Sequence, residues 1–90
     1  MVYPLQFDEA GRIMYDKKAI RQAIAGRLKK AREEAGYSSA ALFCEKHNLP
    51  LERYLGHEEA QLMLNASAAM KYSRLLGVSL KTLLIGDNSL

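Results

Sequence analysis

The stretch Ser38–Ala60, SSAALFCEKHNLPLERYLGHEEA, decides the fold, because its pattern is that of two short helices separated by a tight bend. Side chains suited to one buried face recur in its first half at a spacing of three to four residues. The members of this stripe are Ala40, Phe43, Cys44 and His47. Ser38 or Ser39 precedes the stripe and can cap the first helix by accepting a hydrogen bond from a free amide. The sequence therefore predicts a capped helix that ends near Asn48.

A second helix follows the bend. Pro50 has no backbone donor, so it belongs at the start of a helix and not inside one. We expect the second helix to cover Leu51–Glu59. Its inner side should carry Tyr54, His57 and Glu58. Two helices joined in this way form the geometry in which the second helix can enter a DNA major groove.

Composition indicates one small globular domain. The chain has 90 residues, of which 49% are hydrophobic and 26% charged, and its formal net charge is +3. The single cysteine, Cys44, excludes an internal disulfide and suits a reducing compartment. The chain does not begin with the basic residues and apolar run of a signal peptide. It also has no apolar stretch that approaches the ~20 residues of a membrane span. We therefore expect a cytoplasmic protein without a membrane segment.

Residues 1–16 differ in pattern from the rest of the chain. The segments Val2–Phe7 and Arg12–Tyr15 are rich in residues that favour strands, and Asp8–Gly11 between them suits a turn. We expect a β-hairpin or arm over residues 1–16. An isolated hairpin is marginal in water, so it must pack on something. Two roles stay open: a flap over the helical core, or an arm that joins two chains.

Three further helices complete an all-α fold. Before the bend, Asp16 can cap a helix whose buried stripe ends near Gly36. The stripe is Ile20, Ile24, Leu28, Ala31 and Ala35. After the bend, Asn65 caps a helix over Ala66–Leu76, and Ser79 caps a last helix over Leu80–Ile85. We expect residues 17–87 to form the domain and residues 88–90 to form a frayed tail.

Two flanking motifs resemble a known family. They are RLKKAREEAGY at residues 27–37 and AMKYSRLLGVSL at residues 69–80. With the two-helix stretch between them, they resemble the Cro/CI-type helix-turn-helix family, the XRE-like phage repressors and their relatives. The likeness covers about residues 20–87. It implies a five-helix, lambda-repressor-like domain that is usually dimeric and binds operator DNA as a transcription regulator.

The resemblance also implies roles for single residues. An Arg late in the first helix of the family pairs with a Glu late in the third, which corresponds here to a structural ion pair between Arg32 and Glu58. The family positions that face the bases correspond to Pro50, Leu51, Glu52, Arg53 and Gly56, with Leu55 adjacent. A DNA-binding regulator would also hold phosphates at the start of the second helix. The residues expected to hold phosphates are Ser38 and Ser39 at that start, together with Arg27 and Lys29 or Lys30 of the first helix.

Several of these side chains favour an alternative function. Leu51 and Leu55 can contact only a thymine methyl, and Gly56 offers no side chain to a base. Only Arg53 suits a guanine or a phosphate. The alternative is a protein-interaction module, or an antitoxin-like regulator, built on the same scaffold. Its partner would contact an apolar patch, and the alternative for that patch is that Leu55 and Leu62 simply cover the core. The patch residues are Leu51, Leu55, Leu62 and Met63.

No pattern in the chain indicates an enzyme. We find no nucleophile with an adjacent base, no glycine-rich phosphate loop and no carboxylate pair. His47, His57 and Cys44 are too few and too unevenly spaced for a closed zinc site, which needs four ligands. We therefore expect no catalytic residue, no metal and no cofactor. The expected partner is double-stranded DNA, bound by a homodimer, and the hairpin is one candidate for the contact between the two chains.

Overall fold

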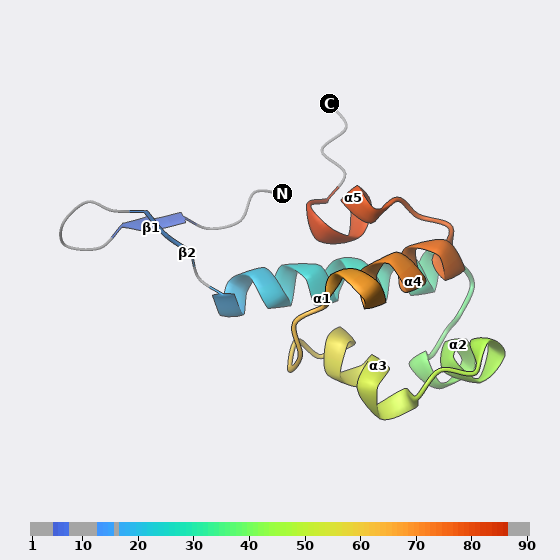
Figure 1. Ribbon diagram of the computed structural model, residues 1–90. Helices are drawn as coiled ribbons and strands as arrows, with labels where there is room; N and C mark the ends of the chain where they lie inside the picture. Colours follow the sequence, from blue (N-terminus) through green and yellow to red (C-terminus); the bar gives the residue numbers. More distant parts are fainter. Residues whose placement is uncertain (1–4, 8–12, 16, 87–90) are drawn as a thin grey trace.

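The computed structural model describes residues 5–7, 13–15 and 17–86, and over these residues it contains five helices and two short strands (Figure 1). The helices are α1 (Lys17–Glu34), α2 (Ala40–His47), α3 (Leu51–Glu58), α4 (Ala66–Leu76) and α5 (Leu80–Leu84). The strands are β1 (Leu5–Phe7) and β2 (Ile13–Tyr15). Residues 17–86 are helical throughout apart from their connections, which confirms the predicted all-α class. Helix α4 has the predicted bounds, and α3 and α5 each end one residue earlier than predicted.

Short polar side chains begin three of the helices. The side chains of Ser39, Asn65 and Ser79 each accept a hydrogen bond from the amide three residues further on, over 3.1, 2.7 and 3.0 Å. Such a bond satisfies an amide that has no partner inside the helix. Gly77 ends α4 in the left-handed conformation with φ of 70°, which glycine adopts at no steric cost. These local signals explain why the sequence predicts the helix boundaries closely.

The bend between α2 and α3 consists of Asn48, Leu49 and Pro50. Asn48 ends α2 in the left-handed conformation with φ of 55°, which asparagine tolerates better than most residues. The amide of Leu49 donates to the carbonyl of Cys44 over 2.8 Å and closes the end of the helix. Pro50 then occupies the position just before the first turn of α3. The predicted sequence of helix, bend and helix is therefore confirmed.

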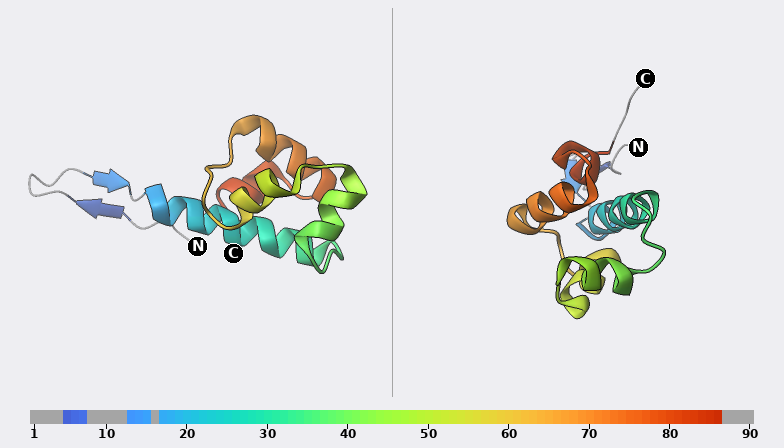
Figure 2. Two further views of the ribbon diagram at one scale, coloured as in Figure 1. Left: turned by 90° about the horizontal axis from the view of Figure 1, so that it is seen from below. Right: turned by 90° about the vertical axis from the view of Figure 1, so that its right-hand side faces the viewer.

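Helix α1 is the element around which the others pack. Helices α3 and α5 both contact α1, while α2 packs on α3 and α4 packs on α5 (Figures 1 and 2). In Figure 1 and in the right-hand view of Figure 2, α5 lies above the level of α1 and the α2–α3 pair lies below it. This arrangement leaves the outer side of α3 at the edge of the domain.

The core lies between these helices and contains both aliphatic and aromatic side chains. Leu28, Phe43, Tyr54 and Leu83 are completely buried. Aromatic rings join neighbouring helices, because Tyr54 contacts Phe43 of α2 at 5.1 Å and Tyr72 of α4 at 5.2 Å between ring centroids. Eight buried or partly buried side chains of this core come from all five helices and from two of the connections between them. They are Leu28, Phe43, Leu49, Tyr54, Tyr72, Leu76, Val78 and Leu83.

The prediction was wrong for one member of the buried stripe of α1. Ala35 is exposed, because α1 ends at Glu34 and the chain turns away before Ala35 can face the core. The inner members Ile24, Leu28 and Ala31 are buried as predicted.

Strands β1 and β2 pair in antiparallel register, with Leu5 opposite Tyr15 and Phe7 opposite Ile13. The predicted hairpin also includes residues 2–4 and 8–12, which lie outside the described residues, as do the Asp16 cap and the tail over residues 88–90. The hairpin and its two alternative roles therefore stay predictions.

Candidate nucleic-acid interface

A buried ion pair attaches α3 to α1. Arg32 donates from Nη2 to Glu58 Oε1 over 2.8 Å and from Nε to Oε2 over 3.1 Å, and both side chains are more than 90% buried. Arg32 also donates from Nη1 to the carbonyl of Tyr37 over 2.7 Å. The pair that the resemblance implied is thus present. A buried pair of this kind adds little net stability, but it fixes the position of α3, because loss of either partner leaves a buried charge.

Two further side chains hold the inner side of α3. Tyr54 is completely buried, and burial, together with the Glu58 carboxylate, raises its pKa far above the ordinary value. His57 is also buried, and its Nδ1 lies 3.1 Å from the Tyr72 hydroxyl. Burial lowers the pKa of His57, and the charge of Arg53 lowers it further. The imidazole is therefore neutral at pH 7. The predicted inner residues of α3 do face the domain.

The end of α3 is fixed by a tight turn. The amide of Gln61 donates to the carbonyl of Gly56 over 2.9 Å, and Ala60 takes the left-handed conformation with φ of 63°. Glycine usually fills that position at the end of a helix. Arg21 of α1 donates from Nε to the carbonyl of Ala60 over 3.2 Å. Arg32 and Arg21 therefore attach α3 and the turn behind it to α1 at two points.

The outer side of α3 matches the prediction at its first turn only. Leu51, Glu52 and Arg53 are exposed. Gly56, which we expected to face a base, is buried instead. The side chain of Leu62 covers it, since a β-carbon placed on Gly56 would lie 2.7 Å from Leu62 Cδ1.

Leu55, which we expected beside the base-facing positions and in the apolar patch, is only partly exposed. It is half-buried and packs against the hydrophobic core, so at least part of its side chain is unavailable to a base or to a partner. Three members of the predicted apolar patch remain exposed: Leu51 by 39%, Leu62 by 48% and Met63 by 45%.

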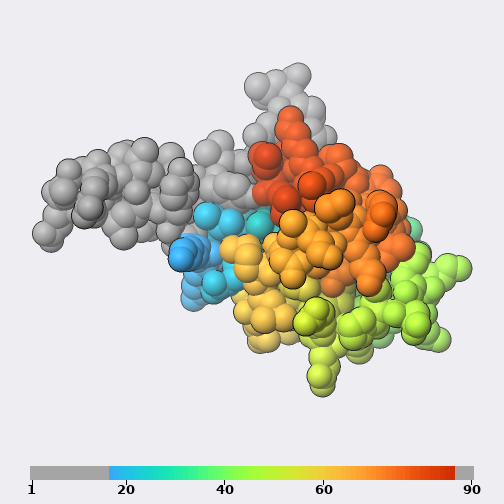
Figure 3. All heavy atoms as spheres, viewed as in Figure 1, coloured from blue at the N-terminus to red at the C-terminus, as the bar shows by residue number. Residues whose placement is uncertain are grey.

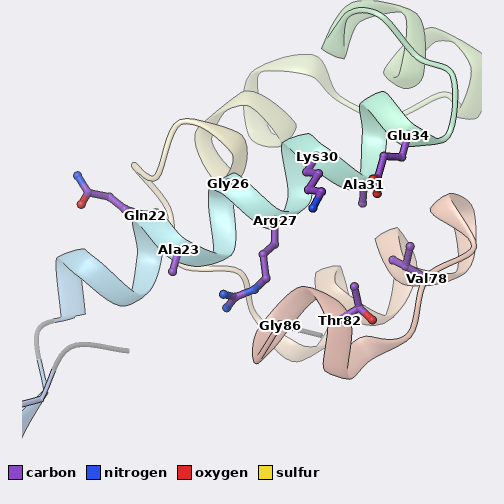
Figure 4. Close-up of a pocket in the computed structure, with 10 residues that line it drawn as sticks. All are labelled: Gln22, Ala23, Gly26, Arg27, Lys30, Ala31, Glu34, Val78, Thr82 and Gly86. Carbon is purple, nitrogen blue, oxygen red and sulfur yellow. The ribbon is translucent and has the colours of Figure 1, made fainter. Parts of the chain in front are cut away.

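Arg27 has a different role from the phosphate contact that we expected. Its Nε and Nη2 donate over 2.8 Å each to the carbonyls of Leu83 and Leu84, at the end of α5. Helix ends leave such carbonyls without internal partners, so Arg27 completes α5 and joins it to α1. Its guanidinium points to α5 (Figure 4).

The remaining expected phosphate contacts lie on α1 and at the start of α2. Ser39 caps α2 through its hydroxyl oxygen, which leaves the hydroxyl proton available as a donor. Ser38, Lys29 and Lys30 are exposed.

The sequence did not predict a cluster of three basic side chains between α3 and α4. Arg53 of α3 and Lys71 and Arg74 of α4 line a pocket of about 290 Å³. Among the described residues, no carboxylate forms an ion pair with any of the three. Lys71 and Arg74 belong to the motif at residues 69–80, but their proximity to Arg53 depends on how α3 and α4 pack. Only the sign of the charges was visible in the sequence.

A larger groove of about 640 Å³ lies between α1 and α5 (Figure 4). Its rim carries charges of both signs, with Lys30 and Glu34 on α1, and its wall includes Arg27, which already binds α5. Charges of both signs give this groove no preference for an anion. It also lies on the side of α1 away from α3, which separates it from the exposed first turn of that helix.

Comparisons of the chain with protein-family models, curated proteins and solved structures found no match. The resemblance to the Cro/CI-type family therefore stays a prediction. Over the described residues, no three His, Cys, Asp or Glu side chains gather in a way that could hold a metal ion. None of the helices in the described ranges is long and apolar enough to cross a bilayer.

Proposed function

We propose that the chain is a lambda-repressor-like helix-turn-helix domain that binds double-stranded DNA as a transcription regulator, with α3 entering the major groove. The observation that carries this proposal is the exposed first turn of a firmly held α3. Leu51, Glu52 and Arg53 are exposed there, while the Arg32–Glu58 pair fixes the helix from behind. A reading element must be rigid to present side chains to base edges in one register.

The charge beside α3 supports the same function. Arg53, Lys71 and Arg74 lie together without a carboxylate partner in the described part of the chain. Unpaired basic side chains next to a helix supply the attraction to phosphates that accounts for most of DNA affinity. Within α3, Arg53 is suited to a guanine or a phosphate, Glu52 can accept from cytosine N4, and Leu51 can contact a thymine methyl.

We further propose that two copies bind a two-fold operator. In such dimers the half-sites lie about 34 Å apart, or a multiple of it, so that both reading helices meet the same side of the duplex. The N-terminal arm over residues 1–16 is one candidate for the dimer contact.

The proposal is tested by binding of the full chain to duplex DNA at several salt concentrations. We expect affinity to fall steeply, with a log–log slope near −0.9 for each phosphate contacted. Arg53→Gln should weaken binding, whereas Lys18→Gln, which removes the same charge at the start of α1, should not. A flat salt response, or no binding at low salt, would remove DNA binding as the function.

The exposed apolar side chains favour a second candidate, a protein partner that contacts the same side of α3. Leu51, Leu62 and Met63 are each exposed by 39 to 48%, and Leu62 lies directly over Gly56. Large exposed apolar side chains gathered near one helix are typical of interaction surfaces. Leu51→Lys with Leu62→Lys should abolish such a complex, including self-association, and leave the fold intact. A complex that survives both changes would exclude this surface.

A further inference from the structure

We propose that the pocket between α3 and α4 is a binding site for one phosphate group, supplied by the backbone of DNA. The pocket has a volume of about 290 Å³ and is lined by residues from the start of α3 and from α4. Its polar lining residues include Arg53, Asn65, Ser67, Lys71 and Arg74. The choice of DNA as the source of the phosphate rests on the function proposed above, while the site itself rests on its own geometry.

The charge of the pocket points to an anion. Three cations from two helices line it, and no Asp or Glu is among the lining residues. No ion pair within the described ranges neutralises Arg53, Lys71 or Arg74. Like charges that converge on one cavity repel each other, and a bound anion replaces this repulsion with attraction. Arg and Lys are the residues that proteins use to hold phosphates, Arg with a planar fork and Lys as a compact charge.

The backbone around the pocket also favours an anion. The pocket runs along α4, the 11-residue helix that Asn65 caps, from its start to Arg74, and it also reaches Pro50 at the start of α3. Pro50 gives α3 no side-chain cap, so the first amides of that helix have no capping side chain. Helix starts carry partial positive charge and free amide donors, which favour a phosphate oxygen. In this pocket the two helix starts act together with the three cations Arg53, Lys71 and Arg74.

Size restricts the ligand. Pockets for ordinary small ligands run from about 300 to 1,000 Å³, so this pocket is at the lower limit and suits a single phosphate with part of its sugar. Figure 3 shows α4 and the first turn of α3 next to each other on one face of the molecule. A phosphate held at this point would fix the exposed start of α3 beside the DNA backbone. The pocket would then set the depth and register of α3 in the groove.

The test compares two variants that lose the same charge. The pocket variant, Lys71→Gln with Arg74→Gln, removes two of the cations that line the pocket. The α1 variant, Lys17→Gln with Lys18→Gln, removes two exposed cations at the start of α1. We measure affinity for duplex DNA against salt with the full chain. The pocket variant should bind more weakly, and its log–log slope should be smaller by about 0.9, the value of one lost phosphate contact. The α1 variant should keep the slope of the wild type.

Folding is checked separately, because a loss of binding must not come from unfolding. The circular dichroism spectra of both variants should match that of the wild type and their urea midpoints should not fall below it, since all four side chains are exposed. The charge-preserving Lys71→Arg should keep the wild-type slope. If the pocket variant is less stable, Lys71→Gln is measured as a single change.

The outcomes separate this inference from the proposed function. In one outcome the wild type binds DNA, and the pocket variant and the α1 variant have the same log–log slope of affinity against salt. The phosphate site is then excluded, and DNA binding stands. If the wild type does not bind DNA, DNA binding fails, and titration with inorganic phosphate and pyrophosphate tests the site. NMR shifts at Ser67–Arg74 that disappear in the pocket variant would support the site, with a free phosphate as its ligand. No such shifts would exclude the site as well.

Discussion

The inner and outer sides of α3 contrast in how tightly the structure constrains them. On the inner side, Tyr54, His57 and Glu58 are each fixed by burial or by a specific partner. On the outer side, Leu51 and Arg53 are exposed. The inner side sets where α3 lies, so changes there should cost stability. The outer side can change with little effect on the fold, and this freedom allows it to carry function.

The largest expected effect comes from breaking the ion pair on the inner side. Arg32→Met leaves the Glu58 carboxylate buried without a partner, which should lower the free energy of unfolding by about 3–5 kcal/mol. Urea unfolding followed by circular dichroism measures this. The double variant Arg32→Met with Glu58→Leu should recover most of the loss, because no buried charge remains. A double variant as unstable as the single one would show that the pair has another role.

A smaller effect should come from acid. The pKa of His57 is below its ordinary value of 6.5 in the folded chain, because burial disfavours the charged ring. Below pH 6.5 the unfolded chain therefore binds more protons than the folded one, and this part of the stability decreases as the pH falls. Unfolding free energies between pH 7.5 and pH 5 should decrease less in His57→Gln than in the wild type. Equal pH dependence in both would contradict a buried neutral His57.

The contact of Leu62 with Gly56 tests the contrast between the two sides of α3, because Gly56 was expected on the outer side and is buried. In an ordinary helix Gly→Ala gains about 1 kcal/mol. Here the new β-carbon would meet Leu62, which must then move. Gly56→Ala should therefore stabilise the chain by about 1 kcal/mol when Leu62 is already replaced by Ala, and by less in the wild type. Thermal unfolding of the wild type, Gly56→Ala, Leu62→Ala and the double variant measures this difference. Equal gains in stability from Gly56→Ala in both backgrounds would show that Leu62 does not cover Gly56.

The smallest effect is expected at the first turn of α3. Leu51→Lys replaces an exposed side chain, so it should change the unfolding free energy by no more than about 0.5 kcal/mol. Equilibrium unfolding in urea checks this value. A loss of more than 1 kcal/mol would mean that Leu51 belongs to the core and that the two sides of α3 do not differ as described.

The parts of the fold that depend on neighbouring residues were predictable from the sequence. Ser39, Asn65 and Ser79 begin helices, and Gly77 ends one, through contacts made within a few residues. The core stripe follows the helical repeat in the same way. These rules predicted the helix bounds closely.

The parts of the site that depend on long-range packing were not predictable in this way. Arg27 was expected to hold a phosphate, but its side chain donates to carbonyls 56 and 57 residues away. Gly56 looked open to DNA, because nothing in the sequence places Leu62 over it. The Arg32–Glu58 pair is the exception, and it was expected from the family resemblance and not from any local pattern.

The most direct test of a DNA-reading surface on α3 is an NMR map of backbone amide shifts on titration of the full chain with duplex DNA. We predict the largest shifts at Leu51–Arg53 of α3 and at Ser67–Arg74 of α4, with smaller changes along the groove between α1 and α5. Shifts confined to that groove, or none at low salt, would contradict the account.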